Sequence, residues 1–97
     1  MKVKVNAIHF AADQKLEDFI QKKVDKLVAY NDSIIEGEVF LRLDKTDSDD
    51  NKVTEMKLRV PGKELFAKKQ SKSFEQATDE VVEALRRQLK KYKEKNS

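Results

Sequence analysis

The chain has 97 residues, with 21 Lys and Arg, 18 Asp and Glu, one His and no Cys or Trp. A chain of this length can bury one hydrophobic core, so we predict a single domain over residues 1–97. The lack of Cys excludes disulfides and thiolate chemistry, and a single His leaves too few ligands for a tetrahedral zinc site. These features predict a protein of the reducing cytoplasm.

The N-terminus lacks the long apolar run of a secretory signal, and no stretch approaches the roughly 18 apolar residues that mark a membrane span. We therefore expect neither export nor membrane insertion. Charged residues make up 40% of the chain, but the formal net charge is only +3. Binding to a polyanion thus depends on how the charges are distributed.

The first third of the chain contains two predicted elements. Residues 2–10 alternate apolar and polar side chains, which predicts a half-buried strand. Asp13 is a candidate N-cap for a helix over about 14–30, because apolar residues recur at helical spacing until the turn-forming residues 31–33.

The middle of the chain returns to a period of two. This pattern predicts a second strand with Val39, Leu41 and Leu43 on its inner face. An acidic polar segment over 44–52 follows, which we interpret as an exposed, mobile loop. A third strand then leads up to Pro61.

Pro61 and Gly62 predict a type II turn, since Pro presets the first central position and Gly accepts a positive φ at the second. A short fourth strand over 64–68 is expected after this turn. Ser73 is a candidate N-cap for a final helix over about 74–94 with one continuous apolar stripe.

The predicted order is therefore β-α-β-β-β-α. Short connections favour an antiparallel meander for the last three strands. Each helix has one apolar stripe, and one face of a four-stranded sheet is enough to bury both stripes. We predict an α+β fold with two layers, in which both helices pack on one face of the sheet.

The charges are segregated along the sequence. Residues 44–55 hold five acids against two bases, whereas residues 83–97 hold six bases against two acids. In the final helix the bases recur three and four residues apart and flank the apolar stripe, and the first helix adds further lysines. A solvated helix face would also explain such a pattern.

The outer face of the predicted sheet mixes bases with Phe40 and Phe66. Exposed aromatic rings can stack on nucleic-acid bases, but these two rings could equally cover one another by cross-strand packing. Acids fall on the same face, so both interpretations stay open. The candidate RNA contacts of this face are Lys2, Lys4, Arg42, Lys57, Arg59 and Lys68.

No pattern in the sequence predicts catalysis. Nucleophile-elbow, Walker and zinc-protease motifs are absent, and two glycines are too few for a phosphate-cradling loop. The acidic stretch 47–51 begins like a calcium loop, but Lys52 occupies the place of the required glycine. His9 lacks a visible orienting partner and is interpreted as a structural or surface imidazole. We predict no enzyme activity, no catalytic residue, no cofactor and no metal site.

The whole chain resembles the short ribosome hibernation-promoting factors, which are relatives of the ribosome-associated translation inhibitors. The resemblance rests on Ala-Ile-His-Phe at 7–10, Leu-Glu-Asp-Phe-Ile-Gln-Lys-Lys-Val at 16–24, Phe-Glu-Gln-Ala at 74–77 and the basic helix at 84–93. It implies the β-α-β-β-β-α fold, a layout like that of double-stranded-RNA-binding domains.

Members of that family bind the small ribosomal subunit in the channel of mRNA and tRNA, and they silence bacterial translation in stationary phase or stress. The resemblance implies the same for this chain, as a monomer that contacts rRNA and neighbouring ribosomal proteins and competes with mRNA and tRNA. Long members carry a C-terminal domain that pairs ribosomes, and we expect none here. The implied rRNA-phosphate contacts are Lys22, Lys23, Lys26, Arg86, Arg87, Lys90, Lys91 and Lys93.

Two other functions stay open. A general RNA-binding module without a privileged ribosomal site would be titrated away by any RNA. A protein-interaction domain that is merely basic at one end would show little salt dependence with RNA.

Overall fold

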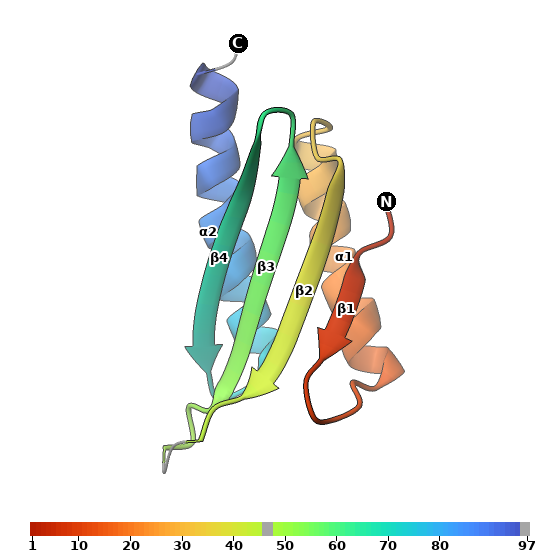
Figure 1. Ribbon diagram of the computed structural model, residues 1–97, viewed down its shortest axis with the longest axis vertical. Coiled ribbons are helices and arrows are strands. Elements are labelled where there is room, and N and C mark those ends of the chain that lie inside the picture. The colour runs from red at the N-terminus through yellow and green to blue at the C-terminus, as the bar shows by residue number, and fades with distance from the viewer. Residues whose placement is uncertain (46–47, 96–97) are drawn as a thin grey trace.

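The structure, a computed structural model, describes residues 1–45 and 48–95. Its order of elements confirms the predicted β-α-β-β-β-α arrangement. Figure 1 shows both helices on the same face of one sheet, which confirms the predicted two-layer α+β fold. The elements are β1 (Lys4–Ala7), α1 (Gln14–Tyr30), β2 (Glu36–Leu43), β3 (Lys52–Val60), β4 (Lys63–Ser71) and α2 (Phe74–Lys95).

The four strands lie in the sheet in the order of the sequence. β1 pairs with β2 in parallel, with α1 as the crossover between them. β2, β3 and β4 form the predicted antiparallel meander. Val60 pairs with Lys63 across a two-residue turn, in which Gly62 has a φ of 83°. This positive φ agrees with the predicted type II turn.

Both helices begin where the sequence predicts. The Asp13 side chain accepts a hydrogen bond from the Leu16 amide at 2.8 Å, and Ser73 Oγ accepts one from the Gln76 amide at 3.0 Å. Each cap satisfies an amide that the first helical turn leaves without a partner.

The core lies between the helix layer and the sheet. The apolar stripes of the two helices meet the inner faces of β2, β3 and β4, and burying this surface is the main stabilising contribution. The largest side chains that are fully or almost fully buried here are Ile20, Val24, Leu27, Val39, Leu41, Met56, Leu58, Val60, Val81, Leu85 and Leu89.

The first strand is shorter than the predicted span of 2–10. At its start the Val3 amide donates to Gln21 Oε1 of α1 at 3.0 Å instead of joining the sheet. At its end the Ile8 amide makes a last bond to the Leu41 carbonyl at 2.9 Å. His9, which is exposed, then takes a φ of 65° and turns the chain toward α1.

Two other features of the sheet differ from the sequence prediction. β4 extends to Ser71, beyond the predicted end at 68, because its backbone pairs with β3 as far as Lys52. This backbone pairing does not require an alternating pattern of side chains. Leu43 was predicted on the inner face, but it is 51% exposed. It pairs with Lys52 at the last position of the β2–β3 ladder.

The acidic loop after β2 is partly described. Asp44, Asp49 and Asp50 are exposed, as predicted, and the Asp44 amide donates to the Asn51 carbonyl at 2.8 Å. Asp47, another acid of this loop, lies outside the described residues. Neither α1 nor α2, the helices within the described ranges, combines the length and apolar character that crossing a membrane requires.

Candidate nucleic-acid interface

The basic residues of α2 stand in two rows on either side of the buried stripe. Positions 86, 90 and 93 form the row on the side of α1, and Lys93 lines a cavity there together with Tyr30. Positions 87, 91 and 95 form the row on the side of β4, where Lys91 and Lys95 lie beside Lys63. The predicted spacing thus separates the bases into two surfaces.

α1 contributes bases of two kinds to the helix layer. Lys22 and Lys26 are exposed. Lys23 has a side chain only 27% exposed, and its ammonium lies 2.9 Å from an Asp79 carboxylate oxygen of α2 and 5.3 Å from the centroid of the Phe19 ring. Lys23 therefore joins the two helices, while its neighbours point to solvent.

Glu83 is the acid that neutralises part of the α2 surface. Its carboxylate lies 2.8 Å from Arg86 and 3.7 Å from Arg87. The hydrogen bond from Arg86 lowers the pKa of the Glu83 carboxyl, and the same bond raises the pKa of Arg86. Glu83 therefore stays ionised at neutral pH and holds both guanidinium groups.

The other predicted basic residues of the helices form no ion pair in the part of the chain that the structure describes. Within residues 1–45 and 48–95, no carboxylate lies within 4.0 Å of their ammonium groups. These five lysines offer their charge to a ligand without first breaking an ion pair. They are Lys22, Lys26, Lys90, Lys91 and Lys93.

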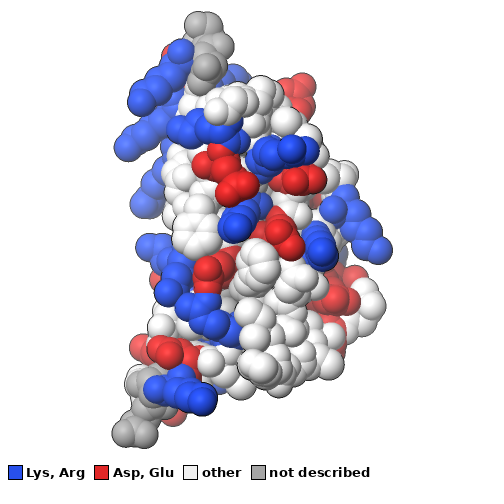
Figure 2. Space-filling model, viewed as in Figure 1, with Lys and Arg blue, Asp and Glu red and all other residues white. Residues whose placement is uncertain are grey.

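Bases concentrate at one end of the molecule. The acids of α2 lie mostly in its first half and its bases in its second half, and α2 ends beside the turn between β3 and β4. Figure 2 shows Lys and Arg atoms gathered at that end and along the edge of the sheet nearest α2. We call this region the basic end, formed by Lys63, Lys90, Lys91, Lys93 and Lys95.

The outer sheet face carries the predicted bases, but most of them lie next to acids. Lys4 lies 3.9 Å from Glu38 and Arg59 lies 3.4 Å from Glu36. Figure 2 shows acidic and basic atoms interleaved across the middle of this face.

The remaining bases of the outer face complete this mixed pattern. Arg42 pairs with Glu55 of β3. Glu55 also faces Lys68 in the strand register. Lys2 is exposed and precedes β1. Carboxylates therefore neutralise part of the positive charge of this face.

The two outer-face phenylalanines are not direct cross-strand partners. Phe40 lies on β2 opposite Glu55, and Phe66 lies on β4 opposite Lys57. The Lys57 ammonium sits 5.8 Å from the centroid of the Phe40 ring. Phe66 remains 45% exposed.

Sequence reasoning missed several bases that adjoin the predicted rows. Lys63 and Lys95 lie beside Lys91 around a hollow of about 150 Å³, and Lys69 lies beside Arg87 around another of about 340 Å³. Lys95 stands four residues after Lys91, so helical spacing could have found it. Lys63 and Lys69 reach α2 from the edge strand, a placement that needs the tertiary fold.

Comparison with known proteins gives consistent findings. A family model described as Sigma 54 modulation protein / S30EA ribosomal protein matches residues 3–97. A curated protein of Pseudomonas putida, named ribosome hibernation promoting factor, is 30% identical over 95 residues, which are 98% of this chain and 89% of that protein.

Two solved structures share the fold. A ribosomal subunit interface protein from Coxiella burnetii superposes with a TM-score of 0.84 at 19% identity, over 96% of this chain and 98% of that one. The N-terminal domain of Thermus thermophilus Protein Y superposes with a TM-score of 0.81 at 22% identity, over 95% and 99% of the two chains.

Proposed function

Because this chain belongs to the Sigma 54 modulation protein / S30EA ribosomal protein family, as its sequence resemblance predicted, we propose that it is a ribosome hibernation factor. In this proposal residues 1–97 form one ribosome-binding domain. The domain occupies the channel of mRNA and tRNA on the small ribosomal subunit and inhibits translation in stationary phase or stress. Its role is to bind, and it catalyses no reaction.

The observation that best supports this proposal is the group of unpaired lysines on the two helices. Each lysine that replaces condensed counterions on RNA phosphates adds affinity, and this contribution falls steeply with salt. Lys90, Lys91 and Lys93 lie within one turn of α2, and Lys26 lies on the neighbouring helix. Such a surface can neutralise several phosphates at once.

Phosphate contacts fix the position of a protein on RNA without reading its sequence. Selectivity for the ribosome would then come from the shape of the channel. The domain measures 45 × 24 × 18 Å, with the basic end at one pole of its long axis. A long, narrow domain with charge concentrated at one end suits insertion into a channel lined with rRNA.

The outer sheet face is the weaker candidate for rRNA contact. A base that is already paired with a carboxylate must lose that partner, or carry it to the RNA, so its net contribution to phosphate binding is small. Lys4, Arg42 and Arg59 are in this position. We therefore assign the main contacts to the helices.

Co-sedimentation with purified ribosomal subunits tests the proposal. The protein should pellet with the small subunit, at low and moderate salt, and not with the large subunit. Subunits loaded with mRNA and tRNA should exclude it, while excess unrelated RNA should not release it. Equal pelleting with both subunits and with bulk RNA would instead identify a general RNA-binding module.

A further inference from the structure

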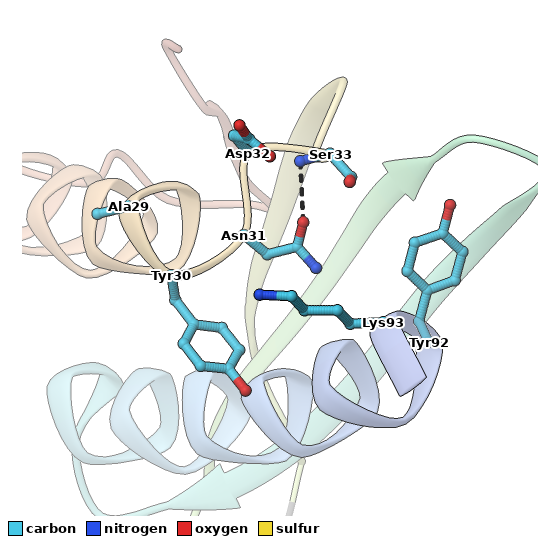
Figure 3. Close-up of a pocket in the computed structure, with 7 residues that line it drawn as sticks. All are labelled: Ala29, Tyr30, Asn31, Asp32, Ser33, Tyr92 and Lys93. Atoms are coloured by element: carbon cyan, nitrogen blue, oxygen red, sulfur yellow. Dashed lines mark hydrogen bonds between the residues drawn. The ribbon is translucent and has the colours of Figure 1, made fainter. Parts of the chain in front are cut away.

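A cavity of about 520 Å³ opens between the C-terminal ends of the two helices (Figure 3). One side comes from the last turn of α1 and the residues that follow it, and the other from the last turns of α2. Lys93 is the one lining residue that was predicted to contact rRNA. Phosphate binding by the two rows of basic residues therefore does not explain the cavity. The lining residues are Ala29, Tyr30, Asn31, Asp32, Ser33, Tyr92 and Lys93.

Tyr30 presents an aromatic ring in this cavity. It is the last residue of α1 and is 39% exposed, so part of its ring is open to a ligand. Figure 3 shows the Tyr30 ring and the Lys93 side chain bordering the same space. Lys93 is the basic residue of the lining. The ring therefore stands beside a cation.

Asn31 adds a fixed polar group to the wall. The residue is only 6% exposed, and its Oδ1 accepts a hydrogen bond from the Ser33 amide at 2.9 Å. This bond sets the orientation of the side-chain amide, so its NH₂ group turns toward the cavity (Figure 3). The amide can donate to a carbonyl oxygen or ring nitrogen, while the Asp32 carboxylate on the rim can accept from an exocyclic amino group.

We infer that this cavity is a nucleobase site, in which an unpaired RNA base stacks on Tyr30 while the adjoining phosphate binds Lys93. The inference rests on the proposed function and deepens it, because it adds a base contact to a surface otherwise described by phosphate contacts. Proteins that bind single-stranded RNA combine basic side chains with aromatic side chains on which bases stack, since every base has a stacking face.

The test compares two probes that differ only in their bases. One is a short oligoadenylate, and the other is an abasic ribose-phosphate oligomer of the same length and charge. Stacking on one aromatic side chain should make the wild-type protein bind the oligoadenylate about 5- to 150-fold more tightly than the abasic oligomer. Binding that depends on phosphate alone gives equal affinities.

Two variants assign the preference to Tyr30. Tyr30→Ala should bind both probes with the affinity of the wild-type protein for the abasic oligomer, because only stacking is removed. Tyr30→Phe keeps the ring and should keep the preference. The chain has two tyrosines and no Trp. The oligoadenylate should therefore quench the fluorescence of the wild-type protein much more than that of Tyr30→Phe, in which Tyr92 is the remaining fluorophore.

The inference is overturned if the wild-type protein shows no preference, or if Tyr30→Ala keeps it, which would place stacking elsewhere, such as on Phe66. Its failure can be separated from that of the proposed function. Small-subunit binding without a base preference would remove the site and leave the function intact. A preference that depends on Tyr30, in a protein that does not bind subunits, would keep the site and remove the function.

Discussion

The Tyr92 hydroxyl donates a 2.8 Å hydrogen bond to the carbonyl oxygen of Pro61. This bond ties the last turns of α2 to the turn between β3 and β4. Lys91 and Lys93 flank Tyr92 in the sequence, so the bond also fixes the helix end that carries the unpaired bases. Tyr92 itself is 9% exposed, and its ring belongs to the core.

Tyr92→Phe should lower the free energy of unfolding by about 0.5–1.5 kcal/mol, because it removes the hydrogen bond and keeps the ring. Tyr92→Ala should lower it by about 3–5 kcal/mol, because it also empties part of the core. Urea denaturation of the two variants separates the contribution of the hydrogen bond from that of the buried ring. An unchanged midpoint for Tyr92→Phe would mean that water replaces the bond at Pro61 without loss.

Leu41 and Leu43 alternate onto the same side of β2, but only Leu41 is buried. We expect Leu41→Ala to lower the free energy of unfolding by about 2–5 kcal/mol and Leu43→Ala to change it by less than about 0.5 kcal/mol. The two variants are matched in chemistry, so urea denaturation compares burial alone. A similar loss for both would show that the helix layer also covers Leu43.

Most of the fold could be predicted because its signals are local. The caps at Asp13 and Ser73, the turn at Gly62 and the two apolar stripes each depend on residues within a few positions of one another. The predicted strand boundaries were wrong where contacts with distant segments set the end of a strand. Gln21 of α1 takes the Val3 amide, and β3 extends β4 to Ser71, and neither effect leaves a pattern in the strand concerned.

The candidate interface, like the fold, could be predicted from the sequence only in part. Helical spacing predicts the two rows of basic residues on α2. Whether each residue is paired with a carboxylate depends on the tertiary fold. Lys23 pairs with Asp79 only because α1 and α2 lie side by side. The cavity lined by Tyr30 likewise lies between the ends of the two helices, and the hydrophobic periodicity of the sequence does not predict it.

Glu83→Gln should strengthen binding to the small subunit, because it releases Arg86 and Arg87 from their shared carboxylate. One or two additional phosphate contacts should make the dependence of log K on log[salt] steeper by about 0.7–2. Filter binding over a salt series measures this slope. Glu36→Gln is the control, since it causes the same change in net charge on the outer sheet face.

The effect of Glu83→Gln should also depend on pH. The pKa of the Glu83 carboxyl is lowered, so the wild-type carboxylate stays ionised until the pH falls through that lowered value. Below it, the protonated wild type should bind like Glu83→Gln. Equal binding of the two proteins at neutral pH would show that Glu83 does not restrain the arginines.

The central claim is that the unpaired lysines of the helix layer, and not the basic residues of the outer sheet face, bind rRNA. Two triple variants test it at equal charge: Lys26, Lys90 and Lys93 to Gln on the helix layer, and Lys4, Lys57 and Arg59 to Gln on the sheet. Each removes three positive charges from exposed positions. Circular dichroism would show whether each variant keeps its helices.

Small-subunit affinity over a salt series is therefore the measurement to make. We expect the helix-layer variant to lose affinity steeply and to reduce the salt slope by about 2–3, as befits three lost phosphate contacts. The sheet variant should stay close to wild type. An equal loss in both variants, or a larger loss in the sheet variant, would contradict the assignment of the rRNA-binding surface to the helices.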